Sequence, residues 1–243
     1  MKRNVRVILG AALAALFATQ VASAGEADVR KNIQTWLGAN APKVENVRKL
    51  EGTGLYEVQI EGDLIYTDEK ISYIFVGGDV VDGKTRKSLT EERKQKLSQI
   101  KFSDLPLELA IKQVKGNGKR VIATFEDPNC TYCKKLAKEL QGITDVTIYT
   151  FIYPIFPNSS ELSKNIWCAS DRSKAWNDYL INGTQPAAAK CDTSGIDKTL
   201  ALGRNLNIRG TPALFFADGS RTPGYMPAAA LEKALDKGSA NIR

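Results

Sequence analysis

The sequence predicts a small α+β N-terminal domain, a charged linker helix and a larger α/β domain with a helical insertion. The first domain is indicated by one amphipathic helical stretch followed by short segments in which apolar and polar residues alternate. The second is indicated by apolar, partly β-branched runs that are separated by helix-forming stretches. A chain of 243 residues is long enough for both units.

A basic and then apolar segment opens the chain. It consists of basic residues, an uncharged apolar run and a small-x-small site, which are Lys2, Arg3 and Arg6, residues 7–21, and Ala22-Ser23-Ala24. These three parts are the pattern of a secretory signal peptide. We therefore predict a signal peptide over residues 1–24 and export of a mature chain that begins at Gly25. The alternative is an uncleaved anchor, for which the apolar run is short.

The mature chain carries a mild positive charge. The predicted signal peptide holds three of the 34 basic residues and none of the 27 acidic ones, which lowers the net charge from +7 to +4. The sequence contains no block of basic residues with interleaved aromatic residues. Nucleic acid is therefore not expected as a partner.

Residues 25–82 are expected to form the first domain. Its helix spans residues 26–37, where Val29 and Ile33 begin a helical spacing of apolar residues and Gly38 follows as a stop. Short antiparallel strands are expected at residues 56–61, 64–66, 71–76 and 80–81. A unit of about sixty residues buries little core alone, and pairing with a second chain often supplies the rest. We therefore predict a dimerisation domain and a homodimer.

Residues 83–103 are interpreted as a linker that contains a helix. Thr90 is the expected N-cap, with Glu91 and Glu92 in the first turn, where carboxylates are favoured. Glu92 and Lys96 form an i,i+4 pair, and apolar side chains are sparse. The pattern predicts a largely solvated connecting helix. It leaves open a surface helix that packs on one of the domains.

Two cysteines lie where a predicted strand, residues 121–125, is followed by a predicted helix, residues 133–140. Unpaired N–H groups and the positive end of the helix dipole favour the thiolate of a cysteine at a helix N-terminus. The thiolate attacks disulfides, and the two-residue spacing lets the second sulfur release the resulting mixed disulfide. We therefore predict Cys130 as the nucleophile and Cys133 as the resolving thiol.

Half of a zinc site is the alternative interpretation of this cysteine pair. The chain contains four cysteines and no histidine, so a zinc site would need all four cysteines. Cys168 and Cys191 lack the close spacing of a second zinc knuckle. Redox chemistry is therefore favoured over a metal site.

Residues 104–243 are expected to form the chemical domain around the cysteine pair. Besides the strand and helix that flank the pair, the expected elements are a helix at 105–114, a strand at 146–151, a helical region at 160–181, a helix at 196–206, strands at 213–216 and 220–222, and a last helix at 228–235. Asp218-Gly219 is a two-residue hairpin signal between the last two strands. This order of elements around a CxxC motif is typical of a thioredoxin-like fold with a helical insertion.

Several separated motifs resemble one family more narrowly. They are Phe125, Cys130-Thr131-Tyr132-Cys133-Lys134, Trp167-Cys168-Ala169, Gly210-Thr211-Pro212-Ala213 and Pro223-Gly224-Tyr225. Together they resemble the periplasmic protein-disulfide isomerases of the DsbC/DsbG family, and the resemblance covers most of the mature chain. It implies a cis-proline loop at Thr211-Pro212 that lies against the CxxC motif, and substrate contacts at Thr131, Tyr132, Thr211 and Pro212. It also implies a structural disulfide between Cys168 and Cys191, which favours the DsbC branch.

The surroundings of the cysteines depart from this family in one residue. Thr131 stands where the DsbC-like motif is expected to have glycine. The residues between the cysteines tune thiolate stability, and ~30 mV in potential corresponds to ~1.4 kcal/mol. The absence of histidine from the motif argues against a strongly oxidising, DsbA-like site. Glu126 and Asp127 lie close to the cysteines in sequence and could raise the Cys130 pKa or accept protons, but solvated loop carboxylates are the favoured interpretation.

The resemblance implies a periplasmic disulfide isomerase that needs no cofactor. Its expected partners are misfolded or unfolded exported proteins, a second copy of the chain, and a DsbD-type membrane reductase that keeps Cys130 and Cys133 reduced. A cleft in the dimer that holds unfolded chains would also give chaperone activity. The alternatives are a dithiol oxidase or reductase, and a holdase that binds unfolded chains without redox chemistry.

Overall fold

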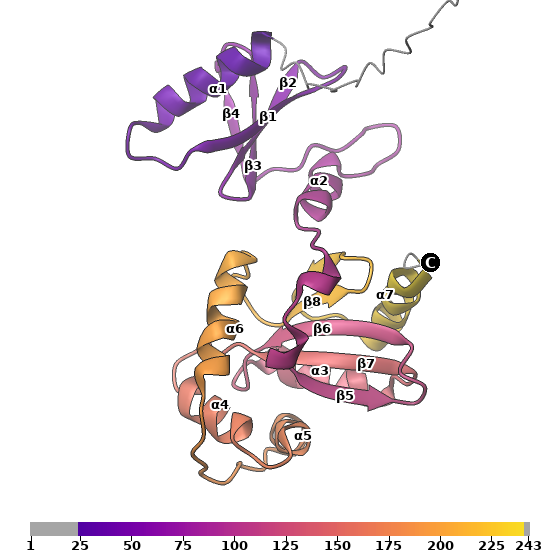
Figure 1. The fold of residues 1–243 in the computed structure, drawn as a ribbon. Coiled ribbons are helices and arrows are strands. Elements are labelled where there is room, and N and C mark those ends of the chain that lie inside the picture. Colours follow the sequence, from indigo (N-terminus) through magenta and orange to yellow (C-terminus); the bar gives the residue numbers. More distant parts are fainter. Residues whose placement is uncertain (1–23, 241–243) are drawn as a thin grey trace, which may run out of the picture. The chain divides into compact units, whose positions relative to one another are not determined.

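The computed structural model describes residues 24–240. The predicted signal peptide therefore lies, except for its last residue, outside the described residues. Contacts divide the chain between Gly78 and Asp79 into two compact units (Figure 1), which are described separately. None of the helices within residues 24–240 is long and apolar enough to cross a membrane.

The first unit is one helix on a four-stranded antiparallel sheet. Its elements are α1 (Ala24–Leu37), β1 (Val44–Leu50), β2 (Leu55–Ile60), β3 (Asp63–Asp68) and β4 (Ile74–Val76), with the strands in that order across the sheet. Val29 and Ile33 of α1 are fully buried against Val47 and Val58 of the sheet. The helix ends where the sequence predicts, because Gly38 adopts a positive φ of 95°.

Two parts of this sheet differ from the prediction. Strand β1 is absent from the prediction because its buried residues Val44, Val47 and Leu50 recur every third position, which is a helical spacing. A bulge between Val44 and Asn46 shifts the register and places Val44 and Val47 on the same face, and Leu50 is the last residue of the strand. The residues expected as a strand at 80–81 form only an isolated bridge, Val81 with Ser88.

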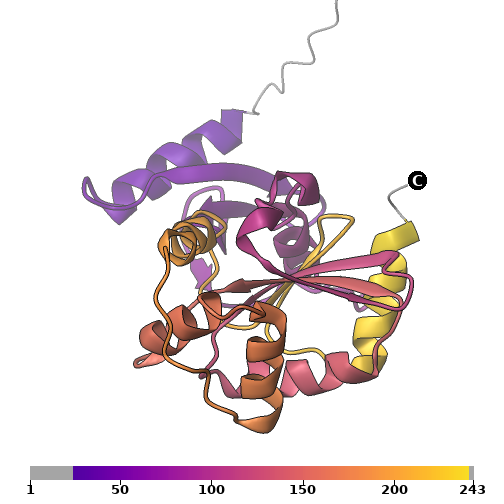
Figure 2. The same cartoon turned by 60° about the horizontal axis from the view of Figure 1, so that its bottom comes forward.

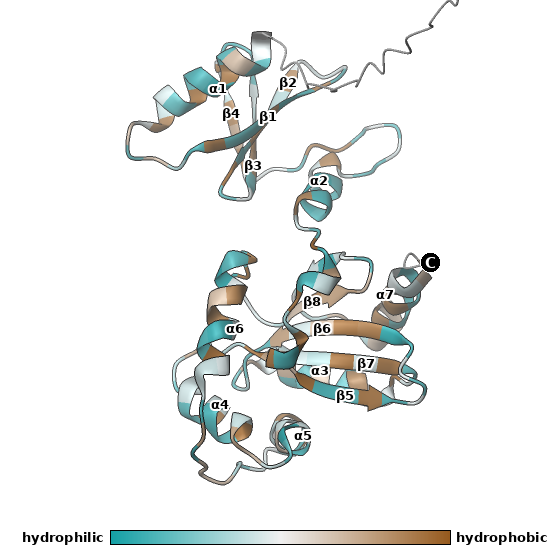
Figure 3. Ribbon diagram, in the orientation of Figure 1, coloured by the Kyte–Doolittle hydropathy of each residue, from teal (hydrophilic) through white to brown (hydrophobic). Residues whose placement is uncertain are grey.

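Helix α2 (Leu89–Leu97) forms within the predicted linker. Its N-cap is Ser88 rather than Thr90, since the Ser88 hydroxyl accepts a hydrogen bond from Glu91 N. Thr90 is instead buried, and its hydroxyl accepts a hydrogen bond from Val80 N. Figure 3 shows α2 largely hydrophilic. The division into an N-terminal domain (25–82), a linker (83–103) and a catalytic domain (104–243) remains a prediction.

The second unit is built on a five-stranded mixed sheet with helices on both faces. Its strands are β5 (Ile111–Lys115), β6 (Arg120–Glu126), β7 (Val146–Ile152), β8 (Ala213–Phe216) and β9 (Arg221–Pro223), in the order β5-β7-β6-β8-β9. Only β6 and β7 pair in parallel. Its helices are α3 (Thr131–Gly142), α4 (Ser159–Trp167), α5 (Arg172–Asn182), α6 (Ser194–Asn205) and α7 (Ala228–Ala240). Helices α3 and α7 cover one face and α6 covers the other (Figure 2).

The predicted helix over residues 105–114 is wrong. The structure has one 3-10 turn there, Leu107–Leu109, and then strand β5; another 3-10 turn, Phe102–Asp104, precedes this range. Residues 111–115 pair along their whole length with β7, and this tertiary pairing outweighs the local helical pattern. The predicted helical region 160–181 is present as two helices, α4 and α5.

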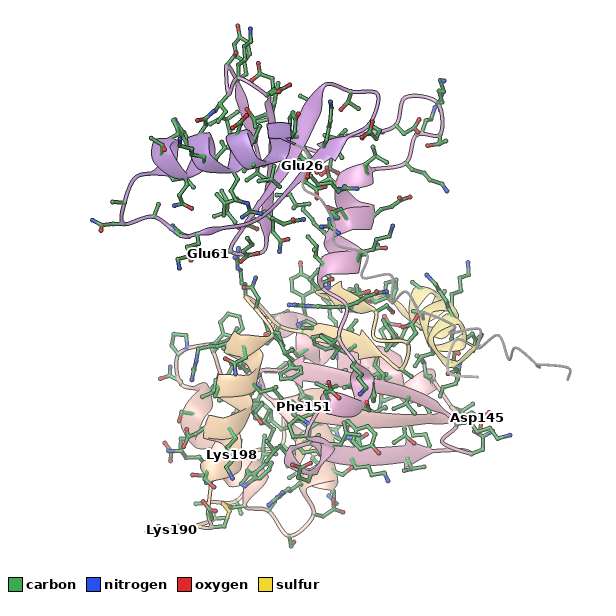
Figure 4. All side chains as sticks on the ribbon, turned by 45° about the horizontal axis from the view of Figure 1, so that its top comes forward. Glu26, Glu61, Asp145, Phe151, Lys190 and Lys198 are labelled. Carbon is green, nitrogen blue, oxygen red and sulfur yellow. A yellow bond between two sulfur atoms is a disulfide. The ribbon has the colours of Figure 1, made fainter. Side chains whose placement is uncertain are left out.

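Strand β6 separates two cores by the alternation of its side chains. Ile122 packs with α3 and α7, whereas Ala123 and Phe125 pack on the opposite face with residues of α6. Phe125 stacks on Phe151 of β7, labelled in Figure 4, with ring centroids 4.6 Å apart. Because β6 and β7 are parallel and β8 is antiparallel to β6, the segments after β6, after β7 and before β8 lie at one edge of the sheet.

Candidate active site

The cysteine pair lies at this edge, at the start of α3. Cys130 is the N-cap residue with extended backbone angles, and both Cys130 and Cys133 are free thiols. Cys130 as a whole residue is 5% exposed, and Cys133 is fully buried. Only Cys130 is therefore placed to meet a bulky substrate first, in agreement with the order of reaction that the sequence predicts.

The environment of Cys130 favours its ionised form. Its pKa is lowered to about 5, chiefly because the Cys133 thiol donates a hydrogen bond to it. Burial acts in the opposite direction, and hydrogen bonds from the Thr211 hydroxyl and from the backbone at Cys133 and Tyr132 lower the pKa further. The site thus holds a thiolate at neutral pH.

Cys133 has the opposite electrostatic environment. Burial raises the pKa of its thiol far above the usual range, and its hydrogen bond to Cys130 and the nearby Glu126 act in the same direction. A thiol at Cys133 can therefore donate to the Cys130 thiolate while it is itself unreactive. It becomes a nucleophile only when a base accepts its proton.

The cis-proline loop lies directly against Cys130. The Thr211–Pro212 peptide bond is cis, and the Cys130 thiol, when protonated, donates to Thr211 O at 3.2 Å. Apart from its interaction with the Cys130 sulfur, the buried Thr211 hydroxyl has no hydrogen-bond partner within residues 24–240. Gly224 N donates to Pro212 O at 2.7 Å. The motif that contains Gly224 therefore helps to hold this loop in place.

The side chains between the two cysteines point to solvent. Thr131 is exposed, and Tyr132 is 54% exposed. The Tyr132 ring lies 6.2 Å from the Tyr225 ring, and Tyr225 in turn donates to Glu139 of α3 at 2.6 Å. The structure thus brings together Cys130, Cys133 and the four residues expected to contact substrate: Thr131, Tyr132, Thr211 and Pro212.

Asp127 is a buried structural carboxylate, so its interpretation as solvated is wrong. It is fully buried and accepts hydrogen bonds from Asn129 N, the Ser159 hydroxyl, Ile155 N and Phe156 N at 2.6–2.9 Å. These bonds fasten the segment before Cys130 to the segment after β7. Ile155 and Phe156 are 40% and 44% exposed, so Asp127 also fixes an apolar surface next to the cysteines.

Glu126 is a functional candidate that the sequence offered only as an alternative, and its favoured interpretation as a solvated carboxylate is also wrong. It is 1% exposed; one carboxylate oxygen accepts from the Thr124 hydroxyl at 2.7 Å. The other oxygen has no partner within the described residues. Burial raises the pKa of Glu126 to about 7, and the Cys130 thiolate adds to the effect. The signal was its place on a strand that is buried on both faces, where an acid is exceptional.

The second cysteine pair lies outside this site. Cys168 and Cys191 form a disulfide with Cα atoms 5.5 Å apart, visible beside Lys190 in Figure 4. It joins the end of α4 to the segment before α6. The four-cysteine zinc site would require this bond to be broken.

Two family models match the chain. One, described as the disulfide bond isomerase protein N-terminal domain, matches residues 20–91, and the other, a thioredoxin-like domain, matches residues 107–239. These matches confirm the two-domain fold class and the thioredoxin-like fold that the sequence predicts.

Relatives and a solved structure agree with these models. A probable thiol:disulfide interchange protein DsbC of Bordetella pertussis is 51% identical over 183 residues, 75% of this chain and 65% of the relative. The thiol:disulfide interchange protein DsbC of Salmonella typhimurium is 29% identical over 239 residues, 96% of this chain and 95% of the relative. The crystal structure of a disulfide interchange protein from Neisseria gonorrhoeae is 39% identical, with a TM-score of 0.54 over 56% of this chain and 99% of that chain. The chain thus spans just under two thirds of the Bordetella relative.

Thr211→Val removes a hydroxyl donor from Cys130 and keeps the β-branched shape. A hydrogen bond to a charged group contributes ~1.5–3 kcal/mol, which corresponds to a rise of about 1–2 units in the Cys130 pKa. The pH dependence of iodoacetamide alkylation measures this pKa, which is about 5 in the native chain. Thr184→Val, at an exposed position after α5, is the matched control and should leave the pKa unchanged. Equal pKa values in the two variants would contradict the role of the Thr211 hydroxyl.

Asp127→Asn replaces one accepting oxygen by an amide that cannot accept. Two of the donors now satisfied by the carboxylate lose their partner, so the free energy of unfolding should fall by about 2 kcal/mol or more. Urea denaturation of the reduced protein measures the change. The control is Asp171→Asn at the N-cap of α5, where the side chain accepts from Lys174 N and asparagine serves equally well. A loss no larger than that of the control would refute the fastening role of Asp127.

Proposed function

Because the chain belongs to the DsbC family of thiol:disulfide interchange proteins, we propose that it is a disulfide isomerase for exported proteins. The observation that carries the proposal is that the Cys130 thiolate lies next to the backbone of Thr211, with which a substrate peptide can pair. Cys130 ionises with a pKa of about 5, and its sulfur lies 3.2 Å from the carbonyl oxygen of Thr211 before the cis-proline. A substrate cysteine and the peptide that carries it can thus be held at the same place.

The first step is attack by the Cys130 thiolate on one sulfur of a wrong disulfide. A bond forms between Cys130 Sγ and that sulfur, the substrate S–S bond breaks, and the other substrate sulfur leaves as a thiolate. Because Cys130 is ionised well below neutral pH, no proton has to be removed before attack. The product is a mixed disulfide.

Substrate binding is expected on both sides of Cys130. An extended peptide can pair with the backbone at Thr211, which gives affinity without sequence preference. Tyr132, Ile155 and Phe156 present exposed apolar surface around the cysteine. Unfolded chains expose apolar side chains next to their cysteines, so this combination suits misfolded proteins. The same surface supports chaperone activity.

The mixed disulfide resolves in one of two ways. Another substrate thiolate attacks the substrate sulfur and completes an isomerisation, or Cys133 attacks Cys130 Sγ and releases the substrate reduced. The second way requires a base for the Cys133 proton. Glu126 is the buried carboxylate that interacts electrostatically with Cys133, and its pKa of about 7 suits proton transfer near neutral pH. We assign Glu126 this role.

An isomerase needs its cysteines reduced in a compartment that favours disulfides. The signal-peptide pattern of residues 1–24 supports export to the periplasm. Repeated turnover through Cys133 leaves a Cys130–Cys133 disulfide, so a reductant must restore the dithiol. We propose a DsbD-type membrane reductase as this partner, with no cofactor on the chain itself.

A dithiol oxidase is the second candidate, favoured by the strongly lowered Cys130 pKa of about 5. A stabilised thiolate stabilises the reduced pair, which makes the oxidised pair a better oxidant. The resting redox state separates the two functions, because an isomerase rests reduced and an oxidase rests oxidised. Trapping the thiols of the protein in cells with an alkylating reagent measures this state.

The first unit supports a homodimer. Strand β4 is an edge strand that exposes Phe75 and Val76 by 54% and 74%, and Tyr73, directly before it, is 73% exposed. An exposed apolar edge strand pairs readily with another strand. We propose that a second copy of the chain covers it.

Reactivation of scrambled ribonuclease in a glutathione buffer tests the isomerase. The mature chain should restore ribonuclease activity, Cys130→Ala should abolish this, and Cys133→Ala should retain part of it, since substrate thiols can still resolve the mixed disulfide. Rapid oxidation of reduced ribonuclease without reactivation of the scrambled form would favour the oxidase instead. Full activity of Cys130→Ala would favour a holdase.

Light scattering tests the dimer. The wild-type chain should have the mass of a dimer, and Val76→Lys should shift the mass toward the monomer because a charge is placed on the edge strand. The control is Trp36→Lys on α1, another exposed apolar residue, at 61% exposure, which should remain dimeric. A monomeric wild-type chain would refute the proposal.

A further inference from the structure

A cavity of about 610 Å³ lies between β5, α3 and α5 in the second unit. Its lining extends from exposed residues, such as Lys112 and Gln141, to the buried Glu126. Ala137 of α3, one turn after Cys133, lies along it, and so does Trp176 of α5. The cavity therefore connects the buried carboxylate with the surface of the protein.

This cavity lies away from the side where substrate is expected. Thr211, which faces the Cys130 sulfur, precedes β8, on one side of β6. Strand β5 lies on the other side of β6, beyond β7. A peptide bonded to Cys130 and paired with Thr211 would close the surface around the cysteines but not the cavity.

We propose that this cavity is the route by which Glu126 passes the Cys133 proton to solvent while a substrate covers Cys130. The inference rests on the role assigned above to Glu126. During resolution, the Cys133 S–H proton moves to the Glu126 carboxylate, and the Cys133 thiolate attacks Cys130 Sγ. The Cys130–Cys133 bond forms, and the substrate sulfur leaves with the electron pair of the broken bond as a thiolate. The Glu126 carboxyl then gives its proton to water in the cavity.

The cavity provides the water that this step needs. One Glu126 oxygen has no partner within residues 24–240, although it is buried. A buried carboxylate is stable in its ionised form only when it is hydrogen-bonded. Thr150, Gln113 and Asn177 also line the cavity, and Gln113 donates to Asn177 at 3.2 Å between β5 and α5. A roomy cavity with several polar partners holds ordered water.

The charges around Glu126 favour its ionised form, which can act as a base, at the moment of resolution. The facing groups are Cys130 and Cys133 at the start of α3, Lys112 and Lys115 on β5, and Asp178 on α5, which pairs with Lys174. Lys115 is held by the carbonyl oxygens of Leu140 and Gln141 at the end of α3. The negative Cys130 thiolate opposes ionisation of Glu126. This opposition ends when Cys130 enters a mixed disulfide, so Glu126 is then a carboxylate ready to accept a proton.

A peptide disulfide with a different chromophore on each half separates the two steps in a single turnover. Attack by Cys130 releases the first half, and attack by Cys133 releases the second. Glu126→Gln should slow the second release by on the order of 100-fold, the size expected for loss of a general base. Ala137→Leu, which fills the cavity, should slow it by about tenfold. The first release should keep its rate in both variants.

Two comparisons separate a blocked route from disturbed packing. Ala175→Leu on α5 adds the same atoms to the same hydrophobic cluster outside the cavity lining, and it should leave both releases unchanged. In the Glu126→Gln background, Ala137→Leu should add no further slowing, since there is no proton to carry. Gln113→Phe, at a half-buried position on β5, provides a second obstruction if Ala137→Leu does not fold.

The outcomes separate the proposed proton route through the cavity from the role of Glu126 as the base. Wild-type rates for the obstructed variants, or an undiminished effect in the Glu126→Gln background, would overturn the route and leave Glu126 as the base. A wild-type second release in Glu126→Gln would overturn both. Neither result bears on the isomerase itself, which the ribonuclease assay decides.

Discussion

The site depends on the carboxylate of Asp127 at the end of β6. The chain has to leave a buried strand and begin a helix within a few residues, and the Asp127 carboxylate accepts from Asn129 N in that turn and from the segment after β7. Its own carbonyl oxygen accepts from Cys130 N at 3.0 Å. The position of the Cys130 sulfur relative to the first N–H groups of α3 follows from this turn, and with it the low pKa of the thiol.

Two adjacent carboxylates have opposite roles because strand residues alternate. Asp127 is saturated with hydrogen bonds and supports structure. Glu126 points toward α3, keeps one oxygen without a partner in the described chain and lies near both cysteines. The thiolate of Cys130, the thiol of Cys133 and the acid of Glu126 form a coupled set in which ionisation of one group changes the others. The chemistry is distributed over this set rather than located in one cysteine.

Local patterns in the sequence predict most helices and strands near the cysteines. They fail where contacts between distant segments determine the structure. Strands β6 and β7 and helices α3 and α6 have regular apolar patterns, and the cysteine pair at a strand–helix junction is itself a local signal. The contact of Cys130 with Thr211 joins residues 81 positions apart, so only the resemblance to a family could anticipate it. The burial of Asp127 depends on the segment at Ile155, and no local pattern reveals it, whereas Glu126 directly follows an apolar run that is typical of a buried strand. Likewise, Val44 and Val47 lie on the same face of β1 only because of a bulge.

Because the helical insertion holds a disulfide of its own, the protein contains two thiol–disulfide couples, Cys130–Cys133 and Cys168–Cys191. Cys168 is half-buried and Cys191 is exposed, so reductants reach this bond without unfolding the domain. It closes a loop of 23 residues, a constraint that stabilises a fold by about 3 kcal/mol in the chain-entropy model. Strong reductants therefore do more than reset the catalytic dithiol: they also loosen the helices beside it. The reduction potential of the Cys130–Cys133 pair can therefore be measured without ambiguity only in a redox buffer that leaves the Cys168–Cys191 disulfide intact.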